Sequence, residues 1–358
     1  MTTRTQREVN ARPAAIESAF TDLWRERAEG GQGGAKARLA TLVSVCRSDA
    51  EADMAGREVA ALNSTRPVRS IIVSLRGAGE PRAVVELRCD ESSRGVCYEE
   101  VTLKEPVSSA GGLPSLLGPL TVPDLPVYLW FPGDLTLDEI LLEHLFAAAD
   151  RVVTDSHSFA DPLDRFRRIH GWIVEHRGDT VFTEMTWTRL GTWREAIGKL
   201  FDPSDSRAFL ADVKGVEIRS SHGSGSPSDR ALLIMGWLAT KLGWAPLRWE
   251  RGDELRAWFA SAAGEIPVTI VEGTAAARGH LLGVHIDCGD VSFQVDRLHG
   301  DASGAIRTCI TCSGEEAERP AYNPLHWSAS ELLCNALEIR SPFADWEDAL
   351  AAIAGLEG

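Results

Sequence analysis

Three groups of residues in this sequence have types and spacings that could do chemistry, and the first is a glycine-rich stretch. Residues 220–230, SSHGSGSPSDR, join a predicted strand to a predicted helix, where such loops present backbone N–H groups to phosphate. Gly223 and Gly225 match the first two glycines of the dinucleotide fingerprint, but Ser228 stands at the third position and no Gly-Lys-Ser/Thr follows. A phosphate loop is therefore one interpretation. A flexible connection with Ser228 as the helix N-cap is the simpler one.

The second group pairs histidine and cysteine at short spacing. His285-x-x-Cys288 and Cys309-x-x-Cys312 lie roughly twenty residues apart, which resembles the ligand spacing of a zinc ribbon. If the strand that contains Cys309 continues through Cys312, these two side chains point to opposite faces and cannot share one metal. A tight turn at Thr311 would restore the zinc site, or a redox pair of the two cysteines. We expect ordinary sheet cysteines, with no metal and no cofactor, and keep zinc and redox roles as alternatives.

The third group consists of histidines among abundant carboxylates, at His144, His157, His170 and His176. Such pairs could serve acid–base catalysis, but no His-Glu-x-x-His, Gly-x-Ser-x-Gly or kinase-like set occurs. The sequence thus favours a binding protein over an enzyme.

A tryptophan–arginine junction, MTWTRLGTWREAIGKLFD at 185–202, contains no pair of nucleophile and base. We expect Trp187 and Arg189 to lie on one side of an extended segment. Thr192 and Glu195 have the spacing of a reciprocal capping pair. Trp193 then begins an apolar stripe of the following helix, which makes it a core residue. Trp187 and Arg189 are candidates for an interface, because Trp and Arg are enriched at hot spots.

Composition bounds the class of protein. The 358 residues are 44% hydrophobic and 25% charged, with a net charge of −15, which is ordinary for a globular protein and unfavourable for binding nucleic acid or an anionic membrane. No apolar run reaches membrane-spanning length, and the first residues lack the apolar core of a secretory leader. Seven scattered cysteines do not form a secreted disulfide framework. We expect a cytoplasmic protein with mostly reduced thiols.

The elements alternate along the chain. A βαβ unit is predicted from a strand at 38–46, a helix at 52–65 and a strand at 68–75, followed by an antiparallel pair at 82–89 and 96–103. Further predicted strands cover 127–131, 151–156, 213–221, 266–273, 279–287, 291–298 and 305–311. Predicted helices cover 13–29, 137–150 and 228–244, others begin at Pro162, Thr192 and Ser328, and a last one runs through Trp346 to Leu356. Capping pairs are expected at Thr136/Glu139 and Ser328/Glu331.

The predicted fold class is α/β or α+β, with two mixed-sheet lobes and flanking helices. An N-terminal helix and glycine-rich linker are expected at 1–37, an N-terminal α/β domain at 38–204 and a C-terminal α/β domain at 205–358.

Several of these segments, taken in order, resemble the glucose-6-phosphate dehydrogenase assembly protein family, the OpcA family. The segments are ARLATLVSVC, NSTRPVRSIIVSL, LPSLLGPLTVPDLPVYLWFPGD, ADRVVTDSHSF, MTWTRLGTWREAIGKLFDP and ALLIMGWLATKLGW. The family pattern has a Pro-Asp-Leu-Pro run into an aromatic strand, an Ala-Asp-Arg strand and a Trp-Thr-Arg-Leu…Trp-Arg-Glu junction. The resemblance covers about residues 38–245.

The resemblance implies a non-catalytic protein that binds glucose-6-phosphate dehydrogenase and favours its active oligomer in the oxidative pentose phosphate pathway. Contacts with that partner are then expected at Trp187, Arg189, Arg194 and Trp130. Cyanobacterial members are associated with thiol-dependent control, but no cysteine here matches a regulatory position. Two rival functions stay open: a sugar-phosphate- or nucleotide-binding enzyme or sensor that uses the 222–230 loop, and a zinc- or thiol-controlled regulator.

Overall fold

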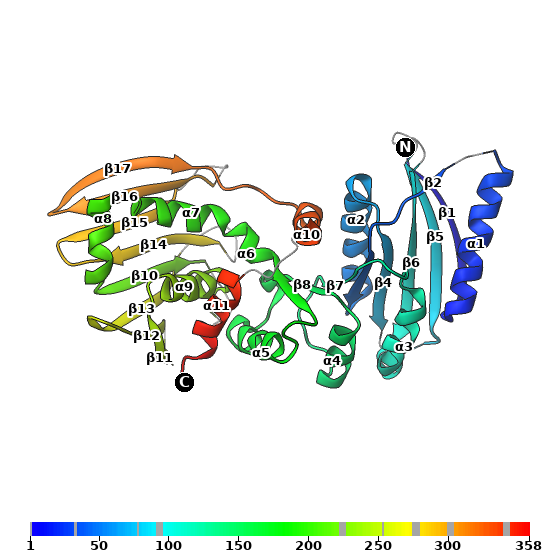
Figure 1. Ribbon diagram of the computed structural model, residues 1–358, viewed down its shortest axis with the longest axis horizontal. Coiled ribbons are helices and arrows are strands. Elements are labelled where there is room, and N and C mark those ends of the chain that lie inside the picture. The colour runs from blue at the N-terminus through cyan, green and yellow to red at the C-terminus, as the bar shows by residue number, and fades with distance from the viewer. Residues whose placement is uncertain are drawn as a thin grey trace. The chain divides into compact units, whose positions relative to one another are not determined.

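The computed structural model describes residues 2–31, 34–76, 79–90, 96–221, 227–252, 254–273, 280–298, 304–338 and 344–358. It has the predicted α/β class and divides into two units, seen in ribbon form in Figure 1. Unit 1 comprises Met1–Ser158, His176–Glu184 and Ser328–Ser341, and unit 2 comprises Phe159–Glu175, Met185–Trp327 and Pro342–Gly358. The expected domains were continuous in sequence, whereas these units are not.

Helix packing explains this difference. α5 (Pro162–Glu175) packs against α9 (Asp229–Lys241) and α11 (Ala344–Ala354), so it belongs to unit 2 although unit 1 segments flank it. α10 (Ala329–Glu338) packs on α2 (Asp49–Thr65) within unit 1, where the Ser330 N–H donates to Glu58 Oε2 at 2.9 Å. An apolar stripe in the sequence shows that a helix needs a partner but not which partner it has.

Unit 1 contains a mixed sheet in the order β1-β5-β6-β4-β3-β7-β8-β9, with β2 beside β6. β3, β4, β7, β8 and β9 run parallel, whereas β5 is antiparallel to both β1 and β6. The predicted βαβ unit is present as β3, α2 and β4. The strands are β1 Thr2–Asn10, β2 Ala35–Lys36, β3 Thr41–Cys46, β4 Arg69–Arg76, β5 Arg82–Asp90, β6 Val96–Pro106, β7 Val127–Phe131, β8 Arg151–Thr154 and β9 Val181–Glu184.

Helices cover both faces of this sheet. α1 (Pro13–Glu29) contacts β1 and β5, and α2 contacts β3 and β4. On β4, Arg69 reaches Glu17 of α1 while the next residue, Ser70, accepts from Asn63 of α2 at 3.2 Å. Because side chains alternate along a strand, α1 and α2 lie on opposite faces. The other helices of unit 1 are α3 Leu113–Leu117, α4 Glu139–Ala147 and three 3-10 turns, η1 Val107–Gly112, η2 Gly118–Leu120 and η3 Ser156–Ser158.

Unit 2 contains a second mixed sheet, in the order β11-β12-β13-β10-β14-β15-β16-β17, with β10 and β13 parallel. Its strands are β10 Gly215–Ser220, β11 Ala245–Arg251, β12 Leu255–Ser261, β13 Gly264–Glu272, β14 Leu281–Asp287, β15 Val291–Arg297, β16 Ile306–Cys312 and β17 Glu315–Tyr322. The remaining helices are α6 Met185–Arg189, α7 Gly191–Leu200, α8 Ser204–Ala208 and the 3-10 turn η4 Phe209–Asp212.

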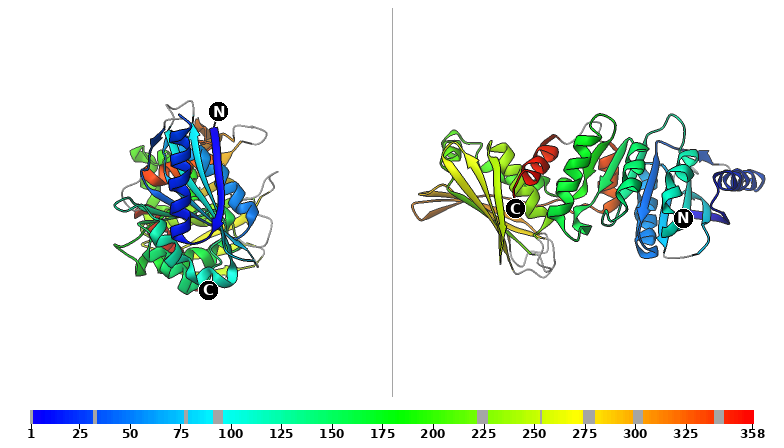
Figure 2. Two further views of the ribbon diagram at one scale, coloured as in Figure 1. Left: turned by 90° about the vertical axis from the view of Figure 1, so that its right-hand side faces the viewer. Right: turned by 90° about the horizontal axis from the view of Figure 1, so that it is seen from below.

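The core of unit 2 is built around α9, which contacts β10, β11 and β13 and is covered by α11 (Figure 2). Gly236 allows the two helices to come close, because a Cβ there would lie 2.4 Å from the carbonyl oxygen of Ala349. α7 packs on β15 and β16. No helix in the described part of the chain is long and apolar enough to cross a membrane.

Of the three predicted capping pairs, only the one at Ser328 and Glu331 is present in the structure. The Glu331 N–H donates to Ser328 Oγ at 3.2 Å and the Ser328 N–H donates to Glu331 Oε2 at 2.7 Å, as expected for the reciprocal pair. α4 is capped by Asp138 and not by Thr136, and α7 begins before Thr192 with no side-chain cap. At α4, the Asp138 carboxylate, two residues after Thr136, accepts from the Ile140 and Leu141 N–H groups instead.

β1, β2, β9, β11, β12 and β17 were not predicted. Edge strand β1, TTRTQREVN, carries few apolar residues, so period-2 hydrophobicity is absent from its sequence. β1 is instead specified by its register with β5, in which Thr2 lies opposite Asp90 and Asn10 opposite Arg82.

Two of the seven cysteines form a disulfide, which was not predicted from the sequence. Cys89 of β5 lies directly opposite Cys97 of β6, with Cα atoms 4.0 Å apart, and the two sulfurs are bonded. Cys46, Cys288, Cys309, Cys312 and Cys334 are free thiols.

In unit 1, three cationic side chains surround one buried carboxylate, that of Glu99. Glu99 of β6 accepts from Lys36 Nζ at 2.6 Å and from Trp24 Nε1 at 2.8 Å, pairs with Arg38, and lies 3.5 Å from Arg69 Nε. Burial raises the pKa of Glu99, but the Lys36 hydrogen bond and the neighbouring cations outweigh it and hold this pKa below its ordinary value. We call Lys36, Arg38, Arg69 and Glu99 the Glu99 cluster.

Candidate functional site: a basic pocket beside the tryptophan–arginine junction

The junction at 185–202 folds as two short helices and not as a strand leading into a helix. α6 contains Trp187 and Arg189, where an extended segment was expected, and Leu190 leads directly into α7. Trp187 is 3% exposed and Trp193 is 2% exposed, so both rings belong to the core of unit 2. The prediction for Trp193 is confirmed, and the expected extended conformation of Trp187 and Arg189 is wrong.

Arg194 is held by the same tryptophan. Its guanidinium carbon lies 3.8 Å from the centroid of the Trp187 ring, and Nη1 donates to the Trp187 carbonyl at 2.7 Å. This cation–π contact and hydrogen bond link α7 to α6. Trp130 of β7, in unit 1, is 1% exposed. Little of either the Trp130 or the Trp187 ring is exposed, and their interface role stays a prediction.

Arg189 has a different environment, because it lines a pocket of about 210 Å³. Three classes of side chain line this pocket: guanidinium groups, imidazoles and apolar groups. The described lining residues are Arg189, Leu190, Trp193, Arg230, His280, Arg297, Pro324, Leu325, His326 and Trp327. We call this the basic pocket.

Four of the five basic side chains of the pocket come from, or directly precede, the end of a regular element. Arg189 ends α6, Arg230 lies in the first turn of α9, and Arg297 ends β15. His280 immediately precedes β14, and Nδ1 of its ring lies 3.5 Å from Arg230 Nη1. Leu190 and Trp193 come from the start of α7, and the irregular segment before α10 supplies the rest of the wall, including the 64% exposed Leu325. Sheet and helix ends thus converge on one small volume.

The electrostatics of the pocket are dominated by positive charge. Arg297 donates from Nε to the Leu281 carbonyl at 3.2 Å. Burial, and then the nearby charge of Arg230, lower the pKa of Arg297 below its ordinary value. None of the described lining residues carries a carboxylate, thiol or hydroxyl group. The pocket can therefore bind and orient an anion, and among its described lining only the two imidazoles could transfer a proton.

Sequence reasoning singled out Arg189 but missed Arg230, His280, Arg297 and His326. These residues are scattered over almost one hundred positions, and none belongs to a motif. The available signal was that Arg230 and Arg297 each occur at an expected element end, where tertiary structure can bring ends together.

The glycine-rich loop can be judged only in part. Gly223 and Gly225 lie outside the described residues. Ser228 is the N-cap residue of α9, as expected, but its side chain makes no capping hydrogen bond and is 4% exposed. Among the described residues of the predicted loop, Arg230 lines the basic pocket.

The histidine–cysteine candidates are not brought together. β16 continues through Cys312, which is exposed, whereas Cys309 is buried, so the two side chains point to opposite faces. His285 lies in β14 opposite Gln294, and Cys288 follows that strand. Burial raises the pKa of Cys288 to about 11. In the described ranges no group of three or more His, Cys, Asp or Glu could hold a metal.

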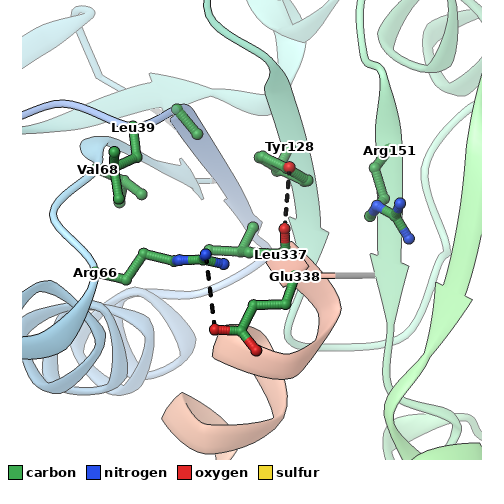
Figure 3. Close-up of a pocket in the computed structure, with 8 residues that line it drawn as sticks. Leu39, Arg66, Val68, Tyr128, Arg151, Leu337 and Glu338 are labelled. Atoms are coloured by element: carbon green, nitrogen blue, oxygen red, sulfur yellow. Dashed lines mark hydrogen bonds and ion pairs between the residues drawn. The ribbon is translucent and has the colours of Figure 1, made fainter. Parts of the chain in front are cut away.

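A second pocket, of about 460 Å³, lies in unit 1 (Figure 3). It is lined by Leu39, Ala40, Arg66, Val68, Tyr128, Arg151, Leu337 and Glu338. The end of α10 closes it: Tyr128 donates to the Leu337 carbonyl at 3.3 Å, and Arg66 Nη2 lies 3.6 Å from Glu338 Oε1. Burial lowers the pKa of Arg151. This pocket lies at the amino ends of β3, β4, β7 and β8, whereas ligands of open α/β sheets bind at carboxyl ends.

Known proteins resemble the chain as follows. Two family profiles match it, both of OpcA type: residues 59–171 match the one described as glucose-6-phosphate dehydrogenase subunit N-terminal domain, and residues 180–306 match its C-terminal counterpart. A protein named OxPP cycle protein OpcA from Synechococcus elongatus is 29% identical over 216 residues, which cover 59% of this chain and 47% of that protein. Its namesake from Nostoc punctiforme is 25% identical over 309 residues, 84% of this chain and 62% of that protein. The chain thus spans about half of the curated relatives it matches.

Solved structures resemble it more distantly. Biliverdin reductase from Synechocystis sp., crystallised with biliverdin and NADP+, is 13% identical with a TM-score of 0.46, covering 88% of this chain and 96% of that one. A Gal80p super-repressor mutant from Saccharomyces cerevisiae is 11% identical with a TM-score of 0.46, covering 88% and 93%. Scores at this level carry no argument about activity.

Proposed function

Because the chain belongs to the OpcA family of glucose-6-phosphate dehydrogenase assembly proteins, we propose that it binds that dehydrogenase directly and favours its active oligomer without catalysing a reaction itself. The observation that carries the proposal is the match of both family profiles in the expected order over residues 59–306. We also propose that this encounter takes place in the cytoplasm.

The thermodynamic requirement on such a factor is differential affinity. A protein that bound active and inactive dehydrogenase assemblies equally well would shift nothing between them. The proposed factor must therefore contact a surface that exists, or is correctly arranged, only in the active assembly.

A non-catalytic role is supported by the carboxyl end of the unit 1 sheet. In dinucleotide-binding sheets a glycine-rich turn and a helix N-terminus hold the pyrophosphate there. Here the turn between β3 and α2 reads Cys46-Arg47-Ser48, and Asp49 and Glu51 occupy the first turn of α2. Ser48 caps Glu51 at 3.2 Å, and Glu51 accepts from the Arg47 N–H at 2.8 Å. These carboxylates would repel a pyrophosphate.

For the dehydrogenase contact we propose the rim of the basic pocket, at Arg189 and Leu325. Leu325 is a large apolar side chain that is 64% exposed, and Arg189 belongs to the segment most typical of the family. An exposed apolar residue next to an arginine suits the centre of a protein interface.

The test is a binding and activation assay with the purified dehydrogenase of the same organism. We expect co-elution of the two proteins in size-exclusion chromatography and higher dehydrogenase activity when this chain is added at micromolar concentration. Leu325→Ser should weaken both effects by roughly tenfold. Ile140→Ser is the matched control, because Ile140 is equally exposed at 64% but lies on α4 of unit 1.

Absence of both association and activation with the unmodified chain would refute the proposed function. Equal loss in the Leu325 and Ile140 variants would refute only the proposed surface. Turnover of a substrate by the isolated chain would refute the non-catalytic role.

A further inference from the structure

We infer that the basic pocket of unit 2 is a binding site for a small phosphate monoester. This ligand site goes beyond the proposed function, because it needs no dehydrogenase and is measurable on the isolated chain. Three features of the pocket support such a ligand: its charge, the placement of its donors, and its small size with an apolar wall.

Arg297, at the end of β15, is one of the three arginines that line the pocket. Its described partner is a backbone carbonyl, that of Leu281, and it forms no ion pair with a residue in the described part of the chain. Arg230 is close enough for its charge to act on Arg297. Holding two guanidinium groups together in a partly desolvated pocket costs free energy, which a bound anion would offset.

Two acidic residues lie next to the pocket arginines in the sequence, and each has a described partner. Asp296 precedes Arg297 in β15 and points to the opposite face, where it pairs with Arg219. Asp229 precedes Arg230, is 5% exposed, and accepts from Thr186 Oγ1 at 3.2 Å. Thr186 in turn accepts from Arg189 Nη1 at 3.3 Å, so Asp229 offsets part of the charge of Arg189.

The donors favour phosphate over a single carboxylate. Three guanidinium groups and two imidazoles line one small volume. A phosphate monoester carries about −1.5 to −2 charges and three terminal acceptor oxygens, whereas a carboxylate offers one charge and two oxygens. Guanidinium groups bind phosphate oxygens in a bidentate manner, which suits a site built from several arginines.

The size of the pocket limits the rest of the ligand. At about 210 Å³ it is smaller than the ~300–1,000 Å³ typical of sites for drug-sized molecules. It can hold a phosphate with a short body but not a dinucleotide. Trp193, Trp327 and Leu325 provide an apolar wall against which that body would pack.

The experiment is a thermal-shift titration of the full chain in a phosphate-free buffer. The probes are inorganic phosphate, glycerol 3-phosphate and citrate, each compared with sodium chloride at the same ionic strength. We expect both phosphate probes to raise Tm in a saturable manner, by about 2–4 °C when the site is nearly full. Glycerol 3-phosphate should bind more tightly than inorganic phosphate, because only its body can contact the apolar wall.

Variants locate the effect. Arg297→Gln and Arg230→Gln should each weaken phosphate binding roughly tenfold or more. Arg256→Gln is the control, because it removes the same charge from the same unit at a half-exposed position of β12. It should leave the titration unchanged. Line broadening of the phosphate ³¹P resonance gives a second reading that needs no unfolding transition.

The inference fails if phosphate acts no differently from chloride, or if Arg297→Gln and Arg230→Gln respond as the unmodified chain does. Saturable binding of citrate alone would also overturn it, because the site would then select carboxylates. If one variant does not fold, the other and the ³¹P reading decide. Failure of dehydrogenase activation would leave this result untouched, so the two proposals fail separately.

Discussion

The Glu99 cluster of unit 1 and the basic pocket of unit 2 each bring three cationic side chains together, but among the described residues only the cluster is built around a carboxylate. In the Glu99 cluster one buried carboxylate lies among the cations, and its pKa is held below the ordinary value. In the basic pocket a neighbouring guanidinium lowers the pKa of Arg297, and no described lining residue is acidic. The first arrangement is complete within the fold, whereas the second is completed by a ligand in our proposal.

The largest effect should come from breaking the complete arrangement. Glu99→Gln would leave Lys36, Arg38 and Arg69 without their shared, buried counter-ion. We expect the free energy of unfolding to fall by about 3 kcal/mol, since removing one partner of a buried pair leaves uncompensated charge. Urea titration measures it.

Glu265→Gln is the control for that experiment, because Glu265 pairs with Arg248 where both side chains are about half exposed. Its cost should stay within about 0.5 kcal/mol. A loss below about 1 kcal/mol in Glu99→Gln would mean that the cluster is not held by its carboxylate, and the contrast with the pocket would disappear.

A second prediction uses the other face of β6, where burial prevails over pairing. Glu100 accepts from Arg88 Nη2 at 2.5 Å, yet burial raises its pKa to about 7. Between its ordinary value and about 7 the folded state holds a proton that the unfolded state has released. Stability should therefore fall as pH rises through this range, by at most about 1.4 kcal/mol per pH unit.

Urea titrations at several pH values, with Glu100→Gln for comparison, isolate this contribution. The Gln variant should lose that part of the pH dependence and gain relative stability toward pH 7. Parallel curves for the two proteins would contradict the raised pKa. The outcome sharpens the comparison, because it shows how much pairing a buried carboxylate in unit 1 needs to stay charged.

Arg194 provides a third, smaller effect, because it belongs to the same junction as Arg189 but is held inside the fold. Arg194→Gln removes the contact with the Trp187 ring and the bond to its carbonyl. We expect a loss of about 1–2 kcal/mol in unfolding free energy, with the phosphate titration unchanged. Loss of phosphate binding without loss of stability would instead mean that Arg194 contacts the ligand and belongs to the pocket.

The smallest effect is expected in the basic pocket itself. In phosphate-free buffer Arg297→Gln should change the free energy of unfolding by less than about 1 kcal/mol, because relief from the charge of Arg230 offsets the lost hydrogen bond to Leu281. A loss above about 2 kcal/mol would show that Arg297 is compensated inside the fold, as the cations of the Glu99 cluster are, and would end the comparison.

The sequence by itself determined the fold class, the βαβ unit, most of the strands and helices, the family, and the burial of Trp193. These features depend on local signals, namely apolar periodicity, prolines at helix starts and the order of short motifs, which need no knowledge of distant residues. The capping pair at Ser328 and Glu331 belongs to this group. Polar strand β1 does not, because its own sequence lacks apolar alternation and its strand conformation depends on pairing with β5.

Tertiary structure alone decided which cations surround a buried carboxylate and which line a pocket whose described lining contains no carboxylate. Arg189, Arg230 and Arg297 are separated by more than forty residues at each step, and only the packing of α6, the start of α9 and the end of β15 brings them to one pocket. Tertiary structure also separates Arg194 from Arg189. The two arginines lie in one sequence segment, but the Arg194 guanidinium packs on the Trp187 ring. Charge balance is set by distances in space, and a sequence records only distances along the chain.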